Sequence, residues 1–189
     1  MIRMATFDDA PQLQQLHGKF VLDTNRLNDD KYEADVQKNG FTVSAGEGSI
    51  RGRIQASHLL LVDVEDSRIL GYIDVNPETY FPEDADNIIW FCEALKHTHY
   101  HDKHAIVLHH IAATTSGKGV ATRLLEDALT RLKSQGYQHL FSIVTTAPVT
   151  NCASVIWHTR NGFSRACVSL PDDLFGLKNY QSVLFYRSI

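Results

Sequence analysis

A glycine-rich turn is the strongest chemical signal in the sequence. Residues 116–121 read SGKGVA and lie between an apolar run and a segment with helical periodicity. The free N–H groups at the start of a helix, and the positive end of its dipole, favour a bound anion. Gly117 and Gly119 permit close backbone approach, and Lys118 adds a positive charge. The turn predicts a phosphate site, although an isolated G-x-G more often makes only a tight turn.

The spacing of this turn excludes two common nucleotide sites. It matches neither the G-x-x-x-x-G-K-[ST] pattern of the P-loop nor the G-x-G-x-x-G pattern of dinucleotide-binding folds. The phosphate is therefore expected to belong to another class of ligand.

A cluster of histidines could gather a metal ion. Six of the ten histidines lie within residues 97–110, namely His97, His99, His101, His104, His109 and His110. No cysteine or H-E-x-x-H pattern accompanies them in a zinc-binding arrangement, so we expect a solvated polar loop and no metal. A metal-dependent protein organised around this cluster is the rival interpretation.

The elements expected around these residues form one mixed α/β domain over residues 1–189. Alternation and turn residues predict a hairpin from strands 59–64 and 69–75. A first strand at 2–5 precedes a helix with Leu13, Leu16 and Phe20 on one face. Residues 87–92 form a further apolar piece. More strands are expected at 105–113, 137–145, 163–168 and 182–186, and helices at 120–136 and 151–161. The pattern weakens over 23–57, where loops surround one strand at 41–44.

Composition narrows the class of protein. The chain has 189 residues, 43% of them hydrophobic, and a formal net charge of −4. Interspersed charges of both signs make a nucleic-acid partner unexpected. The absence of a long apolar run predicts no membrane span, and we expect a cytoplasmic protein. Three scattered cysteines are typical of reduced thiols.

Two motifs resemble those of the GNAT (GCN5-related N-acetyltransferase) superfamily. Ser116 to Ala121 is similar to its R/Q-x-x-G-x-G/A coenzyme A signature, with Ser116 in place of Arg or Gln. Asn151, Ser154, His158, Gly162 and Phe163 are similar to its N-x-x-A/S-x-x-x-Y/H-x-x-x-G-F segment. The resemblance implies a mixed, mostly antiparallel sheet flanked by helices, with two splayed central strands.

The resemblance also implies acetyl-coenzyme A (acetyl-CoA) as cosubstrate. In that family the pantetheine arm lies between the splayed strands and the pyrophosphate lies on the turn. The implied cofactor-binding residues are Ile111, Ala112, Ala113, Ser116, Gly117, Lys118, Gly119, Val120, Ala121, Thr122, Asn151 and Ser154.

Catalytic roles are assigned through the same resemblance. His158 occupies the position of the family's tyrosine and is the candidate general acid, since a histidine with an unperturbed pKa of about 6.5 can serve as an acid near neutral pH if its environment raises that pKa. The alternative is a histidine that only packs beside Trp157. Candidates for the general base are Glu93, Asp74, His109 and His110, of which one of the two histidines should face the opposite side of the sheet.

The sequence therefore predicts an N-acetyltransferase acting on a primary amine of a small molecule or, second, of a protein. A coenzyme A-binding regulatory module of the same fold is the alternative, because both Ser116 and His158 depart from the commoner residues. The acceptor and the acyl-chain preference are not determined by these residues. The oligomeric state is also open, and a homodimer is compatible with the sequence.

Overall fold

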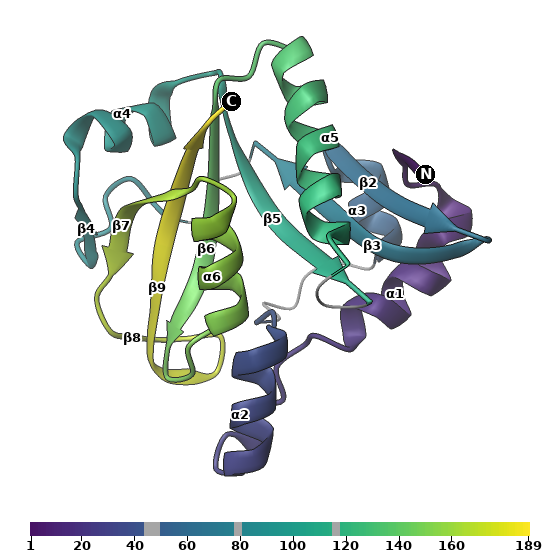
Figure 1. The fold of residues 1–189 in the computed structure, drawn as a ribbon. Coiled ribbons are helices and arrows are strands. Elements are labelled where there is room, and N and C mark those ends of the chain that lie inside the picture. Colours follow the sequence, from purple (N-terminus) through teal and green to yellow (C-terminus); the bar gives the residue numbers. More distant parts are fainter. Residues whose placement is uncertain (44–49, 78–80, 115–117) are drawn as a thin grey trace.

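The strands along the chain form one twisted sheet (Figure 1). The computed structural model describes residues 1–43, 50–77, 81–114 and 118–189. The sheet has the strand order β1-β2-β3-β5-β6-β9-β7-β4, and β8 pairs with β9. The strands are β1 Ile2–Met4, β2 Leu59–Glu65, β3 Arg68–Asn76, β4 Ile88–Trp90, β5 Ala105–Ala113, β6 His139–Ala147, β7 Ser164–Ser169, β8 Asp172–Leu174 and β9 Leu177–Ser188.

The middle of the sheet contains a parallel pair between two antiparallel halves. Strands β5 and β6 are parallel, whereas the other pairs among the described strands are antiparallel. A parallel pair needs a crossover, and the helix α5, Val120–Ser134, supplies it. This mixed, mostly antiparallel sheet confirms the predicted fold class.

Helices cover both faces of the sheet. On one face lie α5 and α6, Cys152–Arg160, and on the other lie α1, Ala10–Gly18, and α3, Ile50–Ala56 (Figure 1). The helix α4, Glu93–His101, contacts the far half of the sheet through Leu95, and α2, Asp30–Asn39, contacts α6. Three-residue 3-10 turns lie at Phe7–Asp9 and Thr24–Arg26.

The helix α5 follows from its apolar spacing. It buries Val120, Leu124, Leu125, Ala128 and Leu132 against the sheet, which is the i, i+4 pattern of a core-facing stripe. The left-handed Gly136, at φ 90°, follows its C-terminus as expected. The predicted strand, turn and helix are thus confirmed where the structure describes them.

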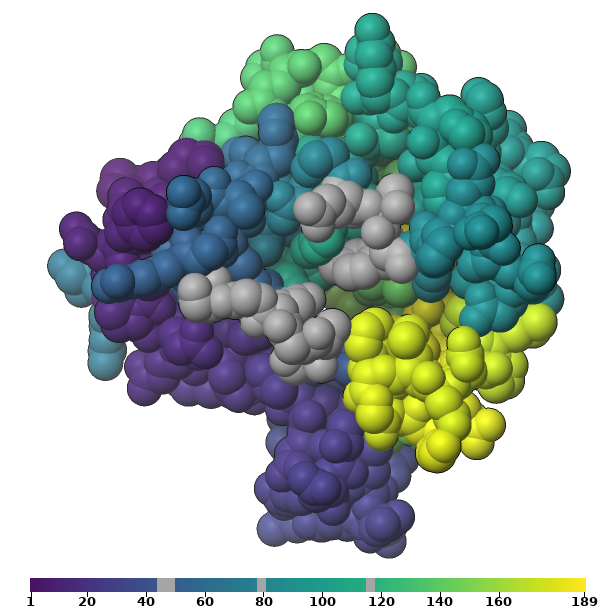
Figure 2. Space-filling view, turned by 180° about the vertical axis from the view of Figure 1, so that it is seen from behind, coloured from purple at the N-terminus to yellow at the C-terminus, as the bar shows by residue number. Residues whose placement is uncertain are grey.

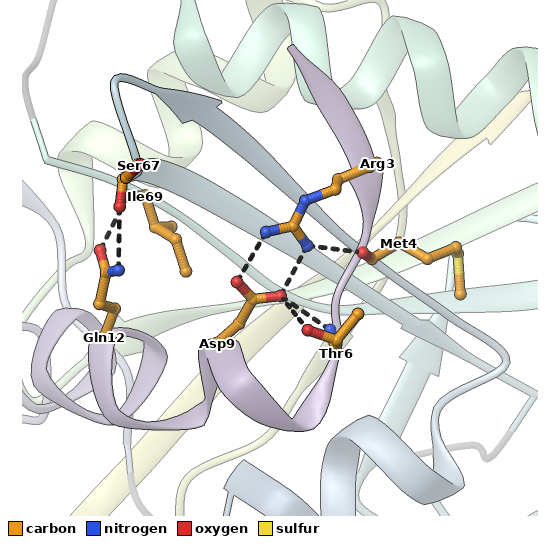
Figure 3. Close-up of polar contacts among 7 residues, drawn as sticks. All are labelled: Arg3, Met4, Thr6, Asp9, Gln12, Ser67 and Ile69. Carbon is orange, nitrogen blue, oxygen red and sulfur yellow. Dashed lines mark hydrogen bonds and ion pairs between the residues drawn. The ribbon is translucent and has the colours of Figure 1, made fainter.

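A polar network holds α1 against the hairpin of β2 and β3 (Figure 3). Arg3 donates to both carboxylate oxygens of Asp9 at 2.6 and 2.8 Å, and Asp9 also accepts from the Thr6 backbone at 2.7 Å. Gln12 donates to the Ser67 carbonyl at 3.1 Å and accepts from the Ile69 backbone. The helix that begins here is therefore tied to both preceding and following strands.

Two predictions about local structure are wrong. Residues 23–57 contain the helices α2 and α3, and the strand expected at 41–44 is only an isolated bridge between Val21 and Thr42, with Ser44 outside the described residues. The helix α2 buries only Val36. Its N-cap residue Asp29 accepts from two backbone N–H groups, so capping outweighs a weak apolar pattern.

The polar loop expected for the histidine cluster is also wrong, because its first part is helical and its last two histidines lie on β5. Residues 97–101 belong to α4, whose His99 is buried against Trp90 and Phe141. No helix of the described residues is long and apolar enough to cross a membrane.

Candidate active site

The two parallel strands separate halfway along their length. Four residue pairs join β5 and β6, from Ala105↔His139 to Leu108↔Ser142. Beyond them β5 stays paired with β3 up to Ala113, and β6 stays paired with β9. An opening therefore begins at Leu108 and Ser142, and the predicted splay is present.

A large cavity follows this opening. It has a volume of about 1580 Å³ and is lined by residues from both faces of the sheet. One side, here called the α5–α6 wall, is formed by Ile111, Ala112, Ala113, Gly119, Val120, Ala121, Thr122, Asn151, Ser154 and His158. The other, the α1–α3 wall, is formed by Phe20, Phe41, Thr42, Arg53, Ser57, Tyr72, Asp74, Asn76, His109, His110, Phe175 and Tyr180.

The α1–α3 wall draws on segments far apart in the sequence. Figure 2 shows the N-terminal helices, in purple and blue, on one side of this face and the C-terminal segment, in yellow, on the other. Residues 39–43 also line the cavity.

The start of α5 is arranged for an anion. Gly119 has φ 70°, a left-handed conformation that favours glycine, and residues 119–122 line the cavity. Arg123 fixes the turn, since it donates to the Lys118 carbonyl at 2.9 Å and to the Asp63 carboxylate at 2.7 Å. Lys118 itself is exposed, and Ser116 and Gly117 lie outside the described residues.

Gly71 allows α5 to approach the sheet closely. A Cβ at this position would lie 2.6 Å from the Ala112 carbonyl oxygen and 2.7 Å from Val120 Cγ1. Ala112 and Val120 are both part of the α5–α6 wall. The closeness of strand and helix at the anion site thus depends on this glycine.

Asn151 joins the two walls. Its Oδ1 accepts from the Ser154 backbone and caps α6, as predicted, while its Nδ2 donates to the Phe41 carbonyl at 2.6 Å. Its side chain is therefore occupied within the protein. The hydroxyl of Ser154 lies 3.2 Å from Nδ1 of His158.

His158 is surrounded by aromatic rings. It is 2% exposed, and the centroids of Trp157, Phe163 and Phe185 lie 4.9, 4.9 and 5.1 Å from its own. Its Nε2 lies 2.9 Å from Ser142 Oγ, and its Nδ1 lies 2.8 Å from the Ser154 carbonyl. Burial lowers the pKa of His158 to about 4, which favours neutral imidazole and does not support an acid at neutral pH.

The candidate bases lie in different places. Glu93 is exposed at the start of α4 and does not line the cavity, so the structure does not bring it to the site. His109 and His110 both line the cavity, next to a β-bulge at which the register with β3 shifts from Asp74↔His110 to Val75↔Leu108. This irregularity is why strict alternation, with one histidine facing away, fails here.

The α1–α3 wall has a buried polar floor. Asp74 accepts from Ser57 at 2.6 Å and from Asn76 at 3.0 Å, and Arg53 lies 3.7 Å from its other oxygen. His110 Nδ1 lies 3.3 Å from Thr42 Oγ1. Burial first, and then the charge of Arg53, lower the pKa of His110 to about 3, so that it is neutral.

Behind this wall lies a third histidine, His17, which does not itself line the cavity and which the sequence did not single out. His17 Nδ1 lies 2.7 Å from the Tyr72 hydroxyl, and the ring of His17 is 5.3 Å from that of His110. Sequence reasoning also missed Arg53, Ser57 and Ser142, since no motif connects their distant segments. No group of three or more potential metal ligands occurs among the residues that the structure describes.

Comparisons with known proteins agree with this geometry. The model of the acetyltransferase (GNAT) family matches residues 24–163, and the chain therefore belongs to this family of acyl-CoA-dependent N-acetyltransferases. Acetyl-CoA is the cosubstrate of these enzymes. No curated protein matches the sequence significantly.

Solved structures share the fold at low identity. A ribosomal-protein-alanine N-acetyltransferase from Brucella melitensis is 16% identical with a TM-score of 0.64, covering 100% of this chain and 99% of its own. The PaiA N-acetyltransferase from Thermoplasma acidophilum, solved with coenzyme A, is 13% identical with a TM-score of 0.61, covering 100% and 98%. A putative streptothricin acetyltransferase from Bacillus anthracis, solved with acetyl-CoA, is 12% identical with a TM-score of 0.55, covering 76% and 69%.

Proposed function

We propose that this enzyme acetylates a primary amine of a small molecule and binds acetyl-CoA along the α5–α6 wall. The observation that carries the proposal is the separation of β5 and β6 directly beside the N-terminus of α5. The opening exposes strand backbone, and the helix start supplies N–H groups for a pyrophosphate.

The proposed cofactor contacts follow the strand and then the turn. The backbone of Ile111, Ala112 and Ala113 would pair with the pantetheine amides. The pyrophosphate would lie on Lys118, Gly119, Val120, Ala121 and Thr122; Ser116 and Gly117, also predicted to bind it, lie outside the described residues. Ser154 lines the same wall, while Asn151 acts through the cap of α6.

The amine would approach from the α1–α3 wall. Asp74 and His110 are 2% and 9% exposed, so their polar atoms lie at the base of the cavity and not on an open surface. Such depth favours a small acceptor, and a protein N-terminus or lysine is the second choice. His110, whose neutral imidazole lines the cavity, is the proposed base. Water is the alternative route for the proton.

The test compares two glycines at opposite ends of α5. Gly119→Glu places a carboxylate at the proposed pyrophosphate, whereas Gly136→Glu makes the same change at an exposed left-handed glycine beyond the C-terminus. In isothermal titration with acetyl-CoA, the first should weaken binding by at least about tenfold, or 1.4 kcal/mol, and the second should not. Equal binding by both variants would contradict the proposed site.

An amine screen distinguishes the enzyme from a regulatory coenzyme A-binding module. The specific observation that favours the module is the buried, neutral His158 in the position of the candidate acid. Release of free coenzyme A that depends on an added amine supports the enzyme. Tight binding without turnover for any amine class supports the module.

The proposal also covers the domain organisation, the location and the oligomeric state of the enzyme. We place residues 1–189 in one domain, since strands from both ends of the chain share one sheet. We also propose a cytoplasmic location and a homodimer. Size-exclusion chromatography with light scattering tests the homodimer.

A further inference from the structure

A serine hydroxyl lies at the point where the two parallel strands separate. Ser142 is the last residue of β6 that pairs with β5, and it lines the cavity while being only 3% exposed. Its Oγ donates to the Leu108 carbonyl at 3.2 Å and lies 2.9 Å from His158 Nε2. The neighbouring Ile143 and Val144 offer no polar side-chain atom.

His158 is built to hold that hydroxyl. Three aromatic rings fix the plane of its imidazole, and both of its nitrogens have hydrogen-bonding partners. Since burial also keeps it neutral, it has no spare proton to deliver at neutral pH. Because His158 is fixed in place, neutral and hydrogen-bonded at both nitrogens, it can affect the reaction only through a neighbouring residue.

We infer that Ser142 is the catalytic residue that meets the thioester sulfur and that His158 is a positioning residue for it. The inference rests on the proposed function, which brings the thioester into the opening where Ser142 lies. A hydroxyl there can turn from the Leu108 carbonyl toward a sulfur atom. The energetic gain comes from a donor that is already in place when charge develops.

The chemical step balances without an acyl-enzyme. The amine nitrogen attacks the thioester carbon, the new N–C bond forms, and the C–S electron pair passes to sulfur. Ser142 donates a hydrogen bond to the developing thiolate and keeps its proton overall. The proton lost by the nitrogen reaches the thiolate through the base or solvent.

The hydrogen-bond chain stays complete during this step. His158 Nε2–H donates to Ser142 Oγ, and His158 Nδ1 accepts from the Ser154 hydroxyl at 3.2 Å. In the other tautomer Nδ1–H donates to the Ser154 carbonyl, and Ser142 then donates to Nε2. Binding of the thioester selects the first arrangement.

The primary test removes the hydroxyl from the full-length enzyme. Ser142→Ala should lower kcat by about 100-fold, as loss of a preorganised donor does, with KM for the amine and Kd for acetyl-CoA within about twofold of wild type. Ser142→Thr keeps the hydroxyl and should retain most of the activity. Thermal unfolding of each variant checks that the sheet is intact.

A second pair of variants tests the positioning role. His158→Phe preserves an aromatic ring inside the cage but removes the bond to Ser142, and it should lower kcat by about tenfold or more. His158→Gln retains an N–H near the Nε2 position and should recover part of that loss. The double variant Ser142→Ala/His158→Phe should be no slower than Ser142→Ala, because the two residues act as one unit.

The outcomes separate this inference from the proposed function. A well-folded wild type that does not bind acetyl-CoA would overturn the proposed function. A wild type that turns over, with Ser142→Ala equally fast, would overturn this inference alone. Additive losses in the double variant would show that His158 acts independently of Ser142, and a kcat profile that follows a His158 titration near pH 6.5 would restore it as the acid.

Discussion

The two walls of the cavity differ in how the sequence builds them. The α5–α6 wall comes from consecutive elements between β5 and α6, so a strand, a glycine turn and a helix start are read in order. The α1–α3 wall joins Phe20 after α1, residues 39–43, α3, β3, β5 and the β8–β9 turn. A cofactor held mainly by backbone therefore has a local signature, whereas an acceptor held by side chains from distant segments does not.

The largest effect is expected where the α5–α6 wall packs most tightly. Gly71→Val would push a branched side chain into the Ala112 carbonyl and Val120, both within 2.7 Å of a Cβ. We expect a loss of about 3 kcal/mol in the free energy of unfolding, measured by urea denaturation. Gly18→Ala, where no atom lies within 4 Å of a new Cβ, is the matched control and should be close to neutral. Equal stability of the two variants would refute the tight contact.

The next effect tests whether Asn151 connects the walls. Asn151→Asp keeps the oxygen that caps α6 but places a carboxylate against the Phe41 carbonyl, which should cost about 2 kcal/mol. Because the lost bond reaches the α1–α3 wall, KM for the amine should rise more than Kd for acetyl-CoA. Asn151→Ser removes the same donor without adding charge and should shift the two constants in the same direction. A selective loss of acetyl-CoA binding would contradict this assignment.

A smaller effect concerns a histidine outside both walls. His99 is 4% exposed, neither of its ring nitrogens has a hydrogen-bond partner among the described residues, and burial lowers its pKa to about 4. The unfolded chain, with a pKa near 6.5, binds more protons than the folded chain below that pH. Stability is therefore fully present above pH 6.5 and falls as the pH drops toward 4, by roughly 1 kcal/mol per pH unit from this group.

His99→Phe removes this contribution. Acid unfolding of the variant should occur at lower pH than that of wild type, while kcat at neutral pH stays the same. His97→Phe, on the exposed face of the same helix, should leave the acid midpoint in place. The buried His17, His110 and His158, whose pKa values are also lowered, contribute to the slope that remains. An unchanged pH midpoint of acid unfolding in His99→Phe would contradict the contribution assigned to His99.

The smallest effect is expected at the ion pair that anchors α1. Arg3 is partly exposed and holds Asp9, whose pKa is lowered to about 2 first by this hydrogen bond. The pair stabilises the fold above the usual aspartate range near pH 4, and this contribution is lost as the pH falls toward 2. Arg3→Gln should cost about 1 kcal/mol at pH 7 and less at pH 3, in urea titrations at both values.

The α5–α6 wall and much of the sheet could be predicted from the sequence. The turn at 116–121, the cap at Asn151 and the glycines that end α5 and α6 were recognisable because each acts within a few residues. The helices α2 and α3 were missed, since α2 is stabilised by its Asp29 cap and a single buried side chain. The link between Ser142 and His158 spans a strand and a helix, and only the folded chain brings the two together.

Side-chain roles were the least predictable part of the site. His158 matches a motif position, yet the rings of Trp157, Phe163 and Phe185 decide its protonation. Glu93 has suitable chemistry but lies on α4, away from the cavity. Such surroundings are tertiary properties, and a motif does not encode them.

The splay also makes two inner strands behave as edges of a sheet. Beyond Leu108 and Ser142, β5 and β6 each bond to one neighbour, so alternate backbone amides along residues 109–113 and 143–147 point into the opening. In hydrogen–deuterium exchange, protection along these stretches should alternate between slow and fast amides. Edge strands invite pairing with other chains, and here the enclosing helices shield that pairing surface from neighbouring molecules while leaving it accessible to a slender ligand.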